Sequence, residues 1–338
     1  MRMKWSSLYI RHRSHTCRDY YPKIGMVRHF HSYAVISSIL LIVLILSGCS
    51  GERAAGESSD ERLYITATTG MIADAAQQIG GSNVQVIGLM GPGVDPHMYK
   101  ASQGDIRKLD DADLVLYNGL HLEGSMTKIL DKMSRSRHVV AVTERIDPVW
   151  LRQSDEYANE HDPHIWFDVS LWSQAVERIR DAIIEADPQH EATYRSNADA
   201  YIGQLQQLHR EVQEQIDTIP QQSRVLITAH DAFGYYGDAY GLEVRGLQGL
   251  STASEYGSRD VAELRNMLVE RQIKAVFAES SIPARAMEAV IAGAAGQGHM
   301  VKLGGELYSD ALGAPDGEAG NYIDMVRHNT HTIVEALR

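Results

Sequence analysis

Short apolar runs rich in β-branched residues alternate with longer stretches of helical periodicity along most of the chain. The runs lie at residues 63–69, 84–90, 114–119 and 139–143 in the first half, and at 224–230, 242–248, 275–280 and 299–304 in the second. Alternation of this kind indicates parallel sheets with helices on both faces. The pattern therefore predicts an α/β protein of two βα lobes, each with a parallel four-stranded sheet.

A stretch without strand signals separates the two arrays at residues 169–218, and its one proline, Pro188, divides it into two helices. Beyond that proline, apolar residues recur every three or four positions, as on one face of an amphipathic helix. These residues are Tyr194, Ala198, Tyr201, Leu205, Leu208, Val212 and Ile216. About 30 helical residues span about 45 Å. We therefore expect one long rigid backbone helix to join the lobes and to prevent large clamshell closure.

The same patterning sets the boundaries of the folded part. We expect an N-terminal α/β lobe at residues 63–186, a linking backbone helix at 187–219 and a C-terminal α/β lobe at 220–338. Residues 49–62 are small and polar without apolar periodicity, which is typical of a flexible tether.

Residues 1–48 have the pattern of a signal peptide. A basic stretch precedes an apolar run at residues 34–46, which is shorter than the roughly 20 residues that span a bilayer. The run ends in Leu-Ser-Gly-Cys, similar to a bacterial lipobox, so we expect Cys49 to be the lipidated first residue of the mature protein. An uncleaved anchor helix is the alternative, and both Met1 and Met26 fit as the start of the leader.

Composition limits the chemistry of the exported part. The two cysteines are Cys17, in the leader, and Cys49, so the folded domain has no thiol for disulfides, zinc sites or nucleophilic catalysis. The whole chain carries a formal net charge of −12, and removal of the basic leader leaves −18 for residues 49–338. An acidic domain of this kind disfavours nucleic acid and attracts cations. A metal site in it must use His, Asp and Glu.

The tripeptide Asp-Pro-His occurs twice, at residues 95–97 and 162–164. Asp-Pro is common turn chemistry, so the following histidine can be a plain loop residue. Two copies that each enter a new element favour instead a presented histidine, with the aspartate orienting a ring nitrogen or capping the next helix. The candidate ligands are His97 and His164, and the candidate supporting residues are Asp95 and Asp162.

Polar groups of the second half also follow strand ends. His230 and Glu279 each stand at the end of an apolar run, and Asp310 follows another. The ligand crevice of an open parallel sheet lies beyond the carboxyl ends of its strands, so two lobes can close one coordination shell between them. His230 can equally cap a helix, and spacing alone does not decide between Glu279 and Asp310 as the carboxylate.

Several segments together resemble the metal-binding receptors of bacterial ABC importers, the cluster A-I or cluster 9 solute-binding lipoproteins, especially their TroA-like branch. Besides the lipobox, the segments are GVDPHMYKASQGDI, DPHIWFDV, ITAHDAFGYYGDAYGLEV, LQGLSTASE, AVFAESSIP and the ending from GGELYSDALG onward. The similarity runs from about Leu63 to Arg338. It implies that His97, His164, His230 and Asp310 ligate the metal, and that Glu279 supports the site without ligating it.

The resemblance also implies a function. It implies an extracytoplasmic lipoprotein that is anchored to the bacterial membrane through lipid on Cys49. Such a protein captures Zn²⁺ or Mn²⁺ as transported cargo and delivers it to an ABC permease and its ATPase. We expect a monomer that is not an enzyme and does not bind nucleic acid. A surface adhesin that retains the receptor fold is one alternative. A metal-dependent hydrolase is the other, although the chain has no HExxH or GxSxG motif.

The sequence leaves the metal open. Three imidazoles and one carboxylate suit zinc and also admit manganese. Zinc-dedicated relatives often carry a long His/Asp-rich loop where this chain has only SDEYANEHD, and manganese-dedicated relatives usually have Glu in place of His230.

Overall fold

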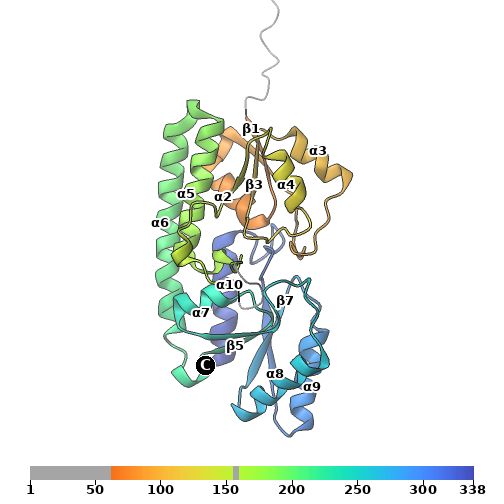
Figure 1. The fold of residues 1–338 in the computed structure, drawn as a ribbon. Helices are drawn as coiled ribbons and strands as arrows, with labels where there is room; N and C mark the ends of the chain where they lie inside the picture. Colours follow the sequence, from red (N-terminus) through yellow and green to blue (C-terminus); the bar gives the residue numbers. More distant parts are fainter. Residues whose placement is uncertain (1–61, 155–159) are drawn as a thin grey trace, which may run out of the picture. The chain divides into compact units, whose positions relative to one another are not determined.

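The computed structural model describes residues 62–154 and 160–338 of the chain (Figure 1). Contacts divide the chain into two compact units, of which Glu61–Arg338 holds all of these residues. The expected signal peptide and the expected lipidation site, Cys49, lie outside the described residues. Among the helices within them, none combines the length and the apolar composition needed to cross a bilayer.

The N-terminal lobe is built on one parallel sheet with the strand order β2-β1-β3-β4. Each strand lies within an apolar run predicted from the sequence, although β4 ends two residues earlier than its run. The strands are β1 (Leu63–Ala67), β2 (Val84–Gly88), β3 (Leu114–Tyr117) and β4 (Val139–Ala141). The helices of this lobe are α2 (Gly70–Gly80), α3 (Gln103–Asp111) and α4 (Thr127–Met133), with short 3-10 turns at Gly81–Asn83 and Pro148–Trp150.

The C-terminal lobe also has four parallel strands, but hydrogen bonds join them as two pairs, β5-β6 and β7-β8. The inner strands β5 and β7 lie in contact with each other. The strands are β5 (Val225–His230), β6 (Glu243–Gln248), β7 (Ala275–Glu279) and β8 (Lys302–Leu307). The helices are α7 (Gly234–Tyr240), α8 (Ser258–Glu270), α9 (Arg285–Gly296) and α10 (Tyr322–Leu337), and a 3-10 turn at Gln221–Ser223 precedes β5.

Two long helices, α5 (Val169–Ala186) and α6 (Glu191–Ile216), run side by side along the molecule (Figure 1). Pro188 separates them because it cannot continue a helical hydrogen-bond ladder, and a 3-10 turn at Pro188–His190 fills the gap. All seven residues of the predicted apolar stripe are buried on α6. This buried face packs against α2 of the first lobe and against α7 and α10 of the second.

Helix α10 is a second connection between the lobes that the sequence analysis did not identify. It packs against α6 and α2, and the backbone N–H of Tyr322, its first residue, donates to Asp74 Oδ2 of α2 at 3.0 Å. The C-terminal helix of the second lobe is therefore held at its start by the first lobe.

An aromatic seam fills the space between the lobes. Phe167, in the 3-10 turn Ile165–Phe167, stacks on Phe233 with ring centroids 4.2 Å apart, and Trp172 of α5 stacks on Tyr322 at 5.3 Å. All four side chains are buried and belong to one apolar cluster that extends into both lobes. Burial of such large side chains is strongly stabilising, so the lobes meet through a packed core.

Candidate metal centre

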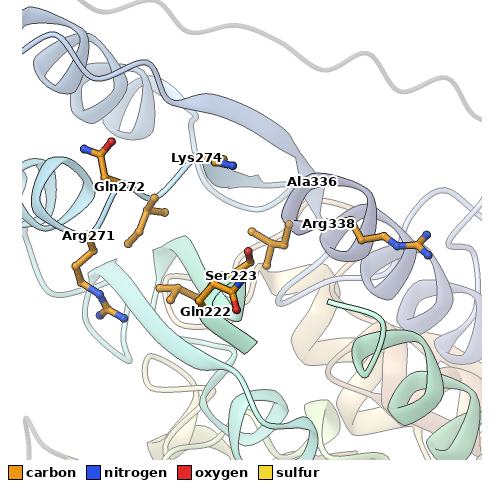
Figure 2. Close-up of a pocket in the computed structure, with 10 residues that line it drawn as sticks. Gln222, Ser223, Arg271, Gln272, Lys274, Ala336 and Arg338 are labelled. Atoms are coloured by element: carbon orange, nitrogen blue, oxygen red, sulfur yellow. The ribbon is translucent and has the colours of Figure 1, made fainter. Parts of the chain in front are cut away.

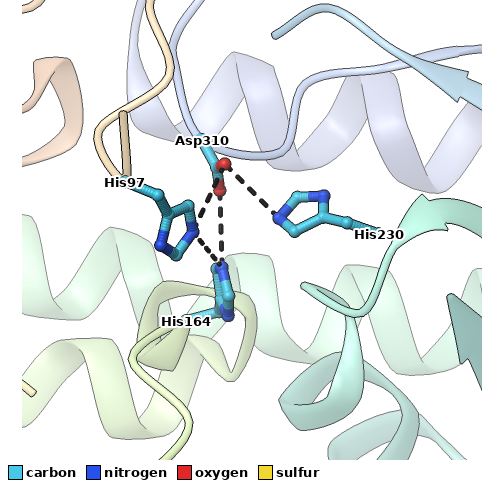
Figure 3. Close-up of side chains that lie close together, drawn as sticks. All are labelled: His97, His164, His230 and Asp310. Carbon is cyan, nitrogen blue, oxygen red and sulfur yellow. Dashed lines mark hydrogen bonds and ion pairs between the residues drawn. The ribbon is translucent and has the colours of Figure 1, made fainter. Parts of the chain in front are cut away.

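His97, His164, His230 and Asp310 converge where the two lobes meet (Figure 3). His230 is the last residue of β5, Asp310 follows β8, His97 lies in the loop after β2, and His164 directly precedes the turn Ile165–Phe167. One ligand atom from each residue lies within 4.8 Å of the others, and all four residues are buried, with His97 the most exposed at 5%. The structure thus brings together the four residues that the sequence analysis selected.

Both Asp-Pro-His tripeptides form the same local turn. In each copy the aspartate Oδ1 accepts the backbone N–H of the histidine two residues later, at 2.9 Å. Proline holds the chain extended between them, and short aspartate side chains commonly close turns of this kind. The repeated tripeptide therefore forms the same turn twice, and in each copy the turn fixes the backbone of the histidine.

The two aspartates differ in their second interaction. Asp162 Oδ1 also accepts a hydrogen bond from Nδ1 of His164 at 2.7 Å, so this aspartate orients the ring as expected. Asp95 binds the backbone of His97, and its Oδ2 accepts a hydrogen bond from Thr252 Oγ1 at 2.6 Å. Of the two roles expected for these aspartates, orienting a ring nitrogen or capping the next helix, Asp162 takes the first, whereas Asp95 contacts the backbone of His97 and Thr252 and not the His97 ring.

Glu279 lies behind His230. Its Oε2 is 2.5 Å from His230 Nδ1, and its Oε1 accepts the backbone N–H of His230 at 2.8 Å. A carboxylate only accepts hydrogen bonds, so it places the proton of the neutral imidazole on Nδ1 and turns Nε2 toward the centre. Asp162 has the same effect on His164.

The distances between the inward-facing atoms match those of a small coordination shell. Nε2 of His97 and of His164 are 3.3 Å apart, and the Asp310 oxygens lie 3.7, 3.5 and 3.3 Å from Nε2 of His97, His164 and His230. A tetrahedron with metal–ligand bonds of about 2.0–2.1 Å has edges of about 3.3–3.4 Å. These separations are close to those edges, and with one ligand atom from each residue within 4.8 Å of the others, the cluster could hold one ion.

Several of these atoms make no hydrogen bond to any described residue: His230 Nε2 and both oxygens of Asp310. Buried acceptors without donors are costly, and native proteins rarely leave them unpaired. A divalent cation at the centre satisfies all of them at once. The donor set of three imidazoles and one carboxylate fits zinc, and also other divalent transition metals.

Burial and mutual proximity shift the ionisation of the cluster. Burial lowers the pKa of His97 to about 3, a shift that the charge of Asp310 opposes and the neighbouring imidazoles reinforce. Burial alone raises the pKa of Asp310, but the imidazoles, His230 foremost, outweigh it and hold that pKa well below its usual range. His97 is therefore neutral and Asp310 ionised at neutral pH, as metal ligation requires.

His230 lies between two carboxylates and behaves differently. Burial lowers its pKa, but the charges of Glu279 and Asp310 prevail and raise it well above its usual range. A metal ion would need the lone pair of Nε2, so it would compete with a proton at His230.

Sequence reasoning missed two residues near the cluster. Asn118 follows β3, is buried, and donates from Nδ2 to the carbonyl of Pro163 at 3.1 Å, next to His164. Its backbone N–H in turn donates to the buried carboxylate of Glu123 at 2.7 Å. The Asn-Gly pair that ends the apolar run at 114–119 was the available signal. The other missed residue, Thr252, lies in the LQGLSTASE segment that contributed only to the resemblance.

A separate cavity of about 90 Å³ lies at the other end of the C-terminal lobe (Figure 2). Its lining includes Val225, the first residue of β5, and Lys274, which directly precedes β7. His230 and Glu279 stand at the opposite ends of the same two strands. The cavity is therefore remote from the His/Asp cluster and contains none of the predicted site residues.

Comparison with known proteins gives the family. Residues 65–336 match the family described as zinc-uptake complex component A, periplasmic. The chain is 50% identical over 304 residues to the manganese-binding lipoprotein MntA of Bacillus subtilis (strain 168), covering 90% of this chain and 99% of that one. It is 47% identical over 280 residues to the zinc-binding protein TroA of Treponema pallidum (strain Nichols), covering 83% and 90%.

Solved structures agree with these matches. The periplasmic zinc-binding protein TroA from Treponema pallidum superposes with a TM-score of 0.80 at 46% identity, covering 82% of this chain and 99% of that chain. A manganese-bound periplasmic metal-binding protein from Candidatus Liberibacter asiaticus superposes with a TM-score of 0.72 at 26% identity, covering 82% and 100%.

Two parallel-sheet lobes joined by a long helix, with a ligand cluster between them, define the class of metal-binding solute receptors. Within that class, the chain belongs to the family of the periplasmic component A of zinc-uptake complexes.

Proposed function

We propose that this chain is an extracytoplasmic receptor that captures a divalent transition metal, zinc or manganese, and delivers it to an ABC permease and its ATPase. The observation that carries the proposal is the convergence of four buried ligand atoms within 4.8 Å of one another. The names of the similar proteins, one manganese-binding and one zinc-binding, support both metals as cargo.

The ligands in this proposal are His97, His164, His230 and Asp310, with Asp95, Asp162 and Glu279 as supporting residues. Each lobe supplies two ligands, so the metal completes a shell that neither lobe completes alone. The lobes in the proposal are residues 63–186 and 220–338, linked by the helix region 187–219. Asp162 and Glu279 hold two of the imidazoles with Nε2 facing the centre.

Metal content and affinity test this proposal directly. The full chain, expressed in defined medium, should contain about one equivalent of a divalent transition metal by mass spectrometry, and calorimetric titration should give one site per chain. A chain that binds neither zinc nor manganese above the level of nonspecific surface binding would refute it. The intrinsic affinity order places zinc above manganese, so we expect the tighter binding for zinc.

We further propose that the protein is not an enzyme. A catalytic zinc site keeps a coordination position open for water and has a general base beside it. Here the two carboxylates nearest the imidazoles, Asp162 and Glu279, are engaged in hydrogen bonds to His164 and His230. Asp310 offers two oxygens, which together with three imidazoles can fill the shell.

Residues 1–48 act as a lipoprotein signal peptide in this proposal, and lipid on Cys49 anchors a monomer to the membrane through the tether 49–62. A Cys49→Ala variant should leave the membrane fraction or accumulate as precursor, because no lipid can be attached. Normal processing with unchanged membrane retention would contradict the lipid anchor while leaving the metal site untouched.

A further inference from the structure

The loop that follows β6 contacts the other lobe beside the candidate metal centre. Thr252, in this loop of the C-terminal lobe, donates from Oγ1 to Asp95 Oδ2 of the N-terminal lobe at 2.6 Å. The other oxygen of Asp95 accepts the backbone N–H of His97 at 2.9 Å. One side chain of the second lobe is therefore two hydrogen bonds away from a ligand of the first.

The loop itself is fixed to the site-forming strands. Gln248, the last residue of β6, donates from Nε2 to the carbonyl of Thr252 at 2.7 Å and also to the carbonyl of Ser254. In the β5-β6 ladder, Gln248 is the register partner of His230. The strand pair β5-β6, which ends in His230, is therefore connected through Gln248, Thr252 and Asp95 to the turn that holds His97.

His97 is the ligand most in need of such support. Asp162 and Glu279 bind both the backbone N–H and Nδ1 of their histidines. Asp95 binds only the backbone N–H of His97, so it sets the position of the turn and leaves the ring orientation to other contacts. His97 is also the most exposed of the four, and its neighbour Met98 is 51% exposed. The turn of His97 therefore lies at the solvent side of the cluster.

The turn of the other histidine also touches the second lobe, but differently. Tyr235 Oη donates to the backbone carbonyl of Asp162 at 2.9 Å, and Arg152 pairs with Asp238 of α7. The carboxylate of Asp162 receives no side chain of the second lobe among its hydrogen bonds in the described structure. Thr252 differs from Tyr235 in that it joins the second lobe to the carboxylate of the aspartate, rather than to its backbone carbonyl.

We propose that Thr252 is a positioning residue that latches the His97 turn to the C-terminal lobe and thereby slows metal release. The proposal rests on the metal-receptor function and adds to it the contact that determines how long the cargo stays bound. When the lobes are in contact, the hydroxyl of Thr252 holds Asp95, and Asp95 holds the backbone of His97 in reach of the ion. When the loop after β6 moves away, the His97 turn loses this restraint. His97 can then detach from the ion before the other three ligands do.

The test compares two substitutions at Thr252 in the full chain loaded with Zn²⁺. Thr252→Val removes the hydroxyl and keeps the branched shape, whereas Thr252→Ser keeps the hydroxyl. The rate of Zn²⁺ release to an excess of a chromogenic chelator is measured by stopped flow. Release should be about 10-fold faster in Thr252→Val, because changes to residues that support a metal ligand typically have effects of this size. Release from Thr252→Ser should stay near the wild-type rate. Equal release rates in Thr252→Val and wild type would overturn the latch.

Ser251→Ala is the matched control in the same loop. Ser251 Oγ accepts the backbone N–H of Ala253 at 3.3 Å, so this change weakens the loop without touching the inter-lobe contact. Release should stay near the wild-type rate. Equal acceleration in Ser251→Ala and Thr252→Val would mean that loop stability, rather than the contact with Asp95, governs release, and would overturn the proposal.

A double-mutant cycle identifies the path and separates this proposal from the receptor function. If Thr252 acts through Asp95, then Thr252→Val should have no further effect on release in an Asp95→Ala background. Additive effects would overturn the path. His97→Ala reports on the site itself: if it binds Zn²⁺ as tightly as wild type, the receptor site is wrong, whereas lost binding in His97→Ala with unchanged release in Thr252→Val rejects the latch alone.

Discussion

At the scale of single residues, the cluster depends on carboxylates in two different roles. Asp310 faces the three imidazoles, while Asp162 and Glu279 stand behind two of them and accept hydrogen bonds from their Nδ1 atoms. A buried carboxylate is costly unless it is paired, so each of these groups requires its histidine as much as the histidine requires it. The three carboxylates and their histidines therefore form one polar network. We expect substitutions within it to lower the metal affinity by different amounts, according to whether the residue faces the ion or supports a histidine.

Substitution of any of His97, His164, His230 or Asp310 by Ala should abolish tight zinc binding, because each removes one ligand atom. Asp162→Asn and Glu279→Gln should weaken binding by about 10–100-fold, since they disturb only the orientation of an imidazole. Calorimetric titration with zinc and with manganese measures both classes.

The matched control is His299→Ala. His299 Nε2 lies 2.7 Å from the carbonyl of Ile273, at the opposite end of the C-terminal lobe, so its loss should leave metal affinity unchanged. Abolished binding in Glu279→Gln together with normal binding in Asp310→Ala would show that the carboxylate ligand was assigned to the wrong residue.

At the scale of elements, local sequence signals decide where helices begin. Helix α3 starts at a capping box in which Ser102 accepts the backbone N–H of Asp105, and the Asp105 carboxylate accepts the backbone N–H of Ser102. Asp105 also accepts hydrogen bonds from Tyr99 and Ser102 hydroxyls and from Lys108. These interactions, the Ser102 hydroxyl first among them, hold the pKa of Asp105 well below its usual range.

The capping box makes a pH-dependent contribution to stability. The folded pKa of Asp105 lies below the unfolded value of about 3.9, so its stabilisation is fully present above that pH and is lost as the pH falls further. Asp105→Ala should lower the free energy of unfolding by about 1–2 kcal/mol at pH 7 and at pH 5. Urea denaturation should show the difference from wild type shrinking below about pH 4. A difference that grows in acid would contradict the proposed ionisation.

At the scale of the whole molecule, several structures join the lobes besides the predicted helix α6. Helix α10 contacts α6 and α2, Asp74 accepts the first backbone N–H of α10, and the aromatic seam from Phe167 to Tyr322 is buried. Opening such a contact exposes a large apolar area to water, which is unfavourable. Helix α10 and the aromatic seam therefore oppose a wide hinge motion. We expect movement to be confined to the loops around the cluster.

Metal loading should therefore change the overall dimensions very little. We expect the radius of gyration from small-angle scattering to be the same for metal-free and zinc-loaded protein within error, because α6, α10 and the seam persist in both. Amide hydrogen exchange should show protection limited to the loops around His97, Thr252 and Asp310. Marked compaction on loading would mean that the lobes separate in the metal-free state.

Removal of the metal should lower the stability of the whole folded unit. An ion that binds only the folded state adds about 2.7 kcal/mol when its free concentration is 100 times Kd. The Tm should rise with added zinc and fall when a chelator is present, and calorimetry measures both shifts. In His230→Ala the two Tm values should coincide, and a zinc-dependent Tm in that variant would place the ion elsewhere.

The local features of this protein could be predicted from the amino-acid pattern. Alternation of apolar runs and helical stretches predicted the strands to within a few residues, and the stripe from Tyr194 to Ile216 predicted the buried face of α6. The repeated Asp-Pro-His identified two turns that the structure shows to be alike. Such features depend on residues close together in the chain, whose spacing a linear pattern preserves.

Which distant residues meet, in contrast, depends on how the chain packs. Asp310 rather than Glu279 faces the imidazoles because the chain continues past the end of β8: Glu279 and its register partner Leu307 end the two strands level, with Glu279 beside Nδ1 of His230, while Asp310 lies beyond Leu307 and faces Nε2. The pairing of Thr252 with Asp95 joins residues 157 positions apart. No local periodicity encodes such contacts, because they arise from how strand ends, loops and helices pack once the lobes have come together.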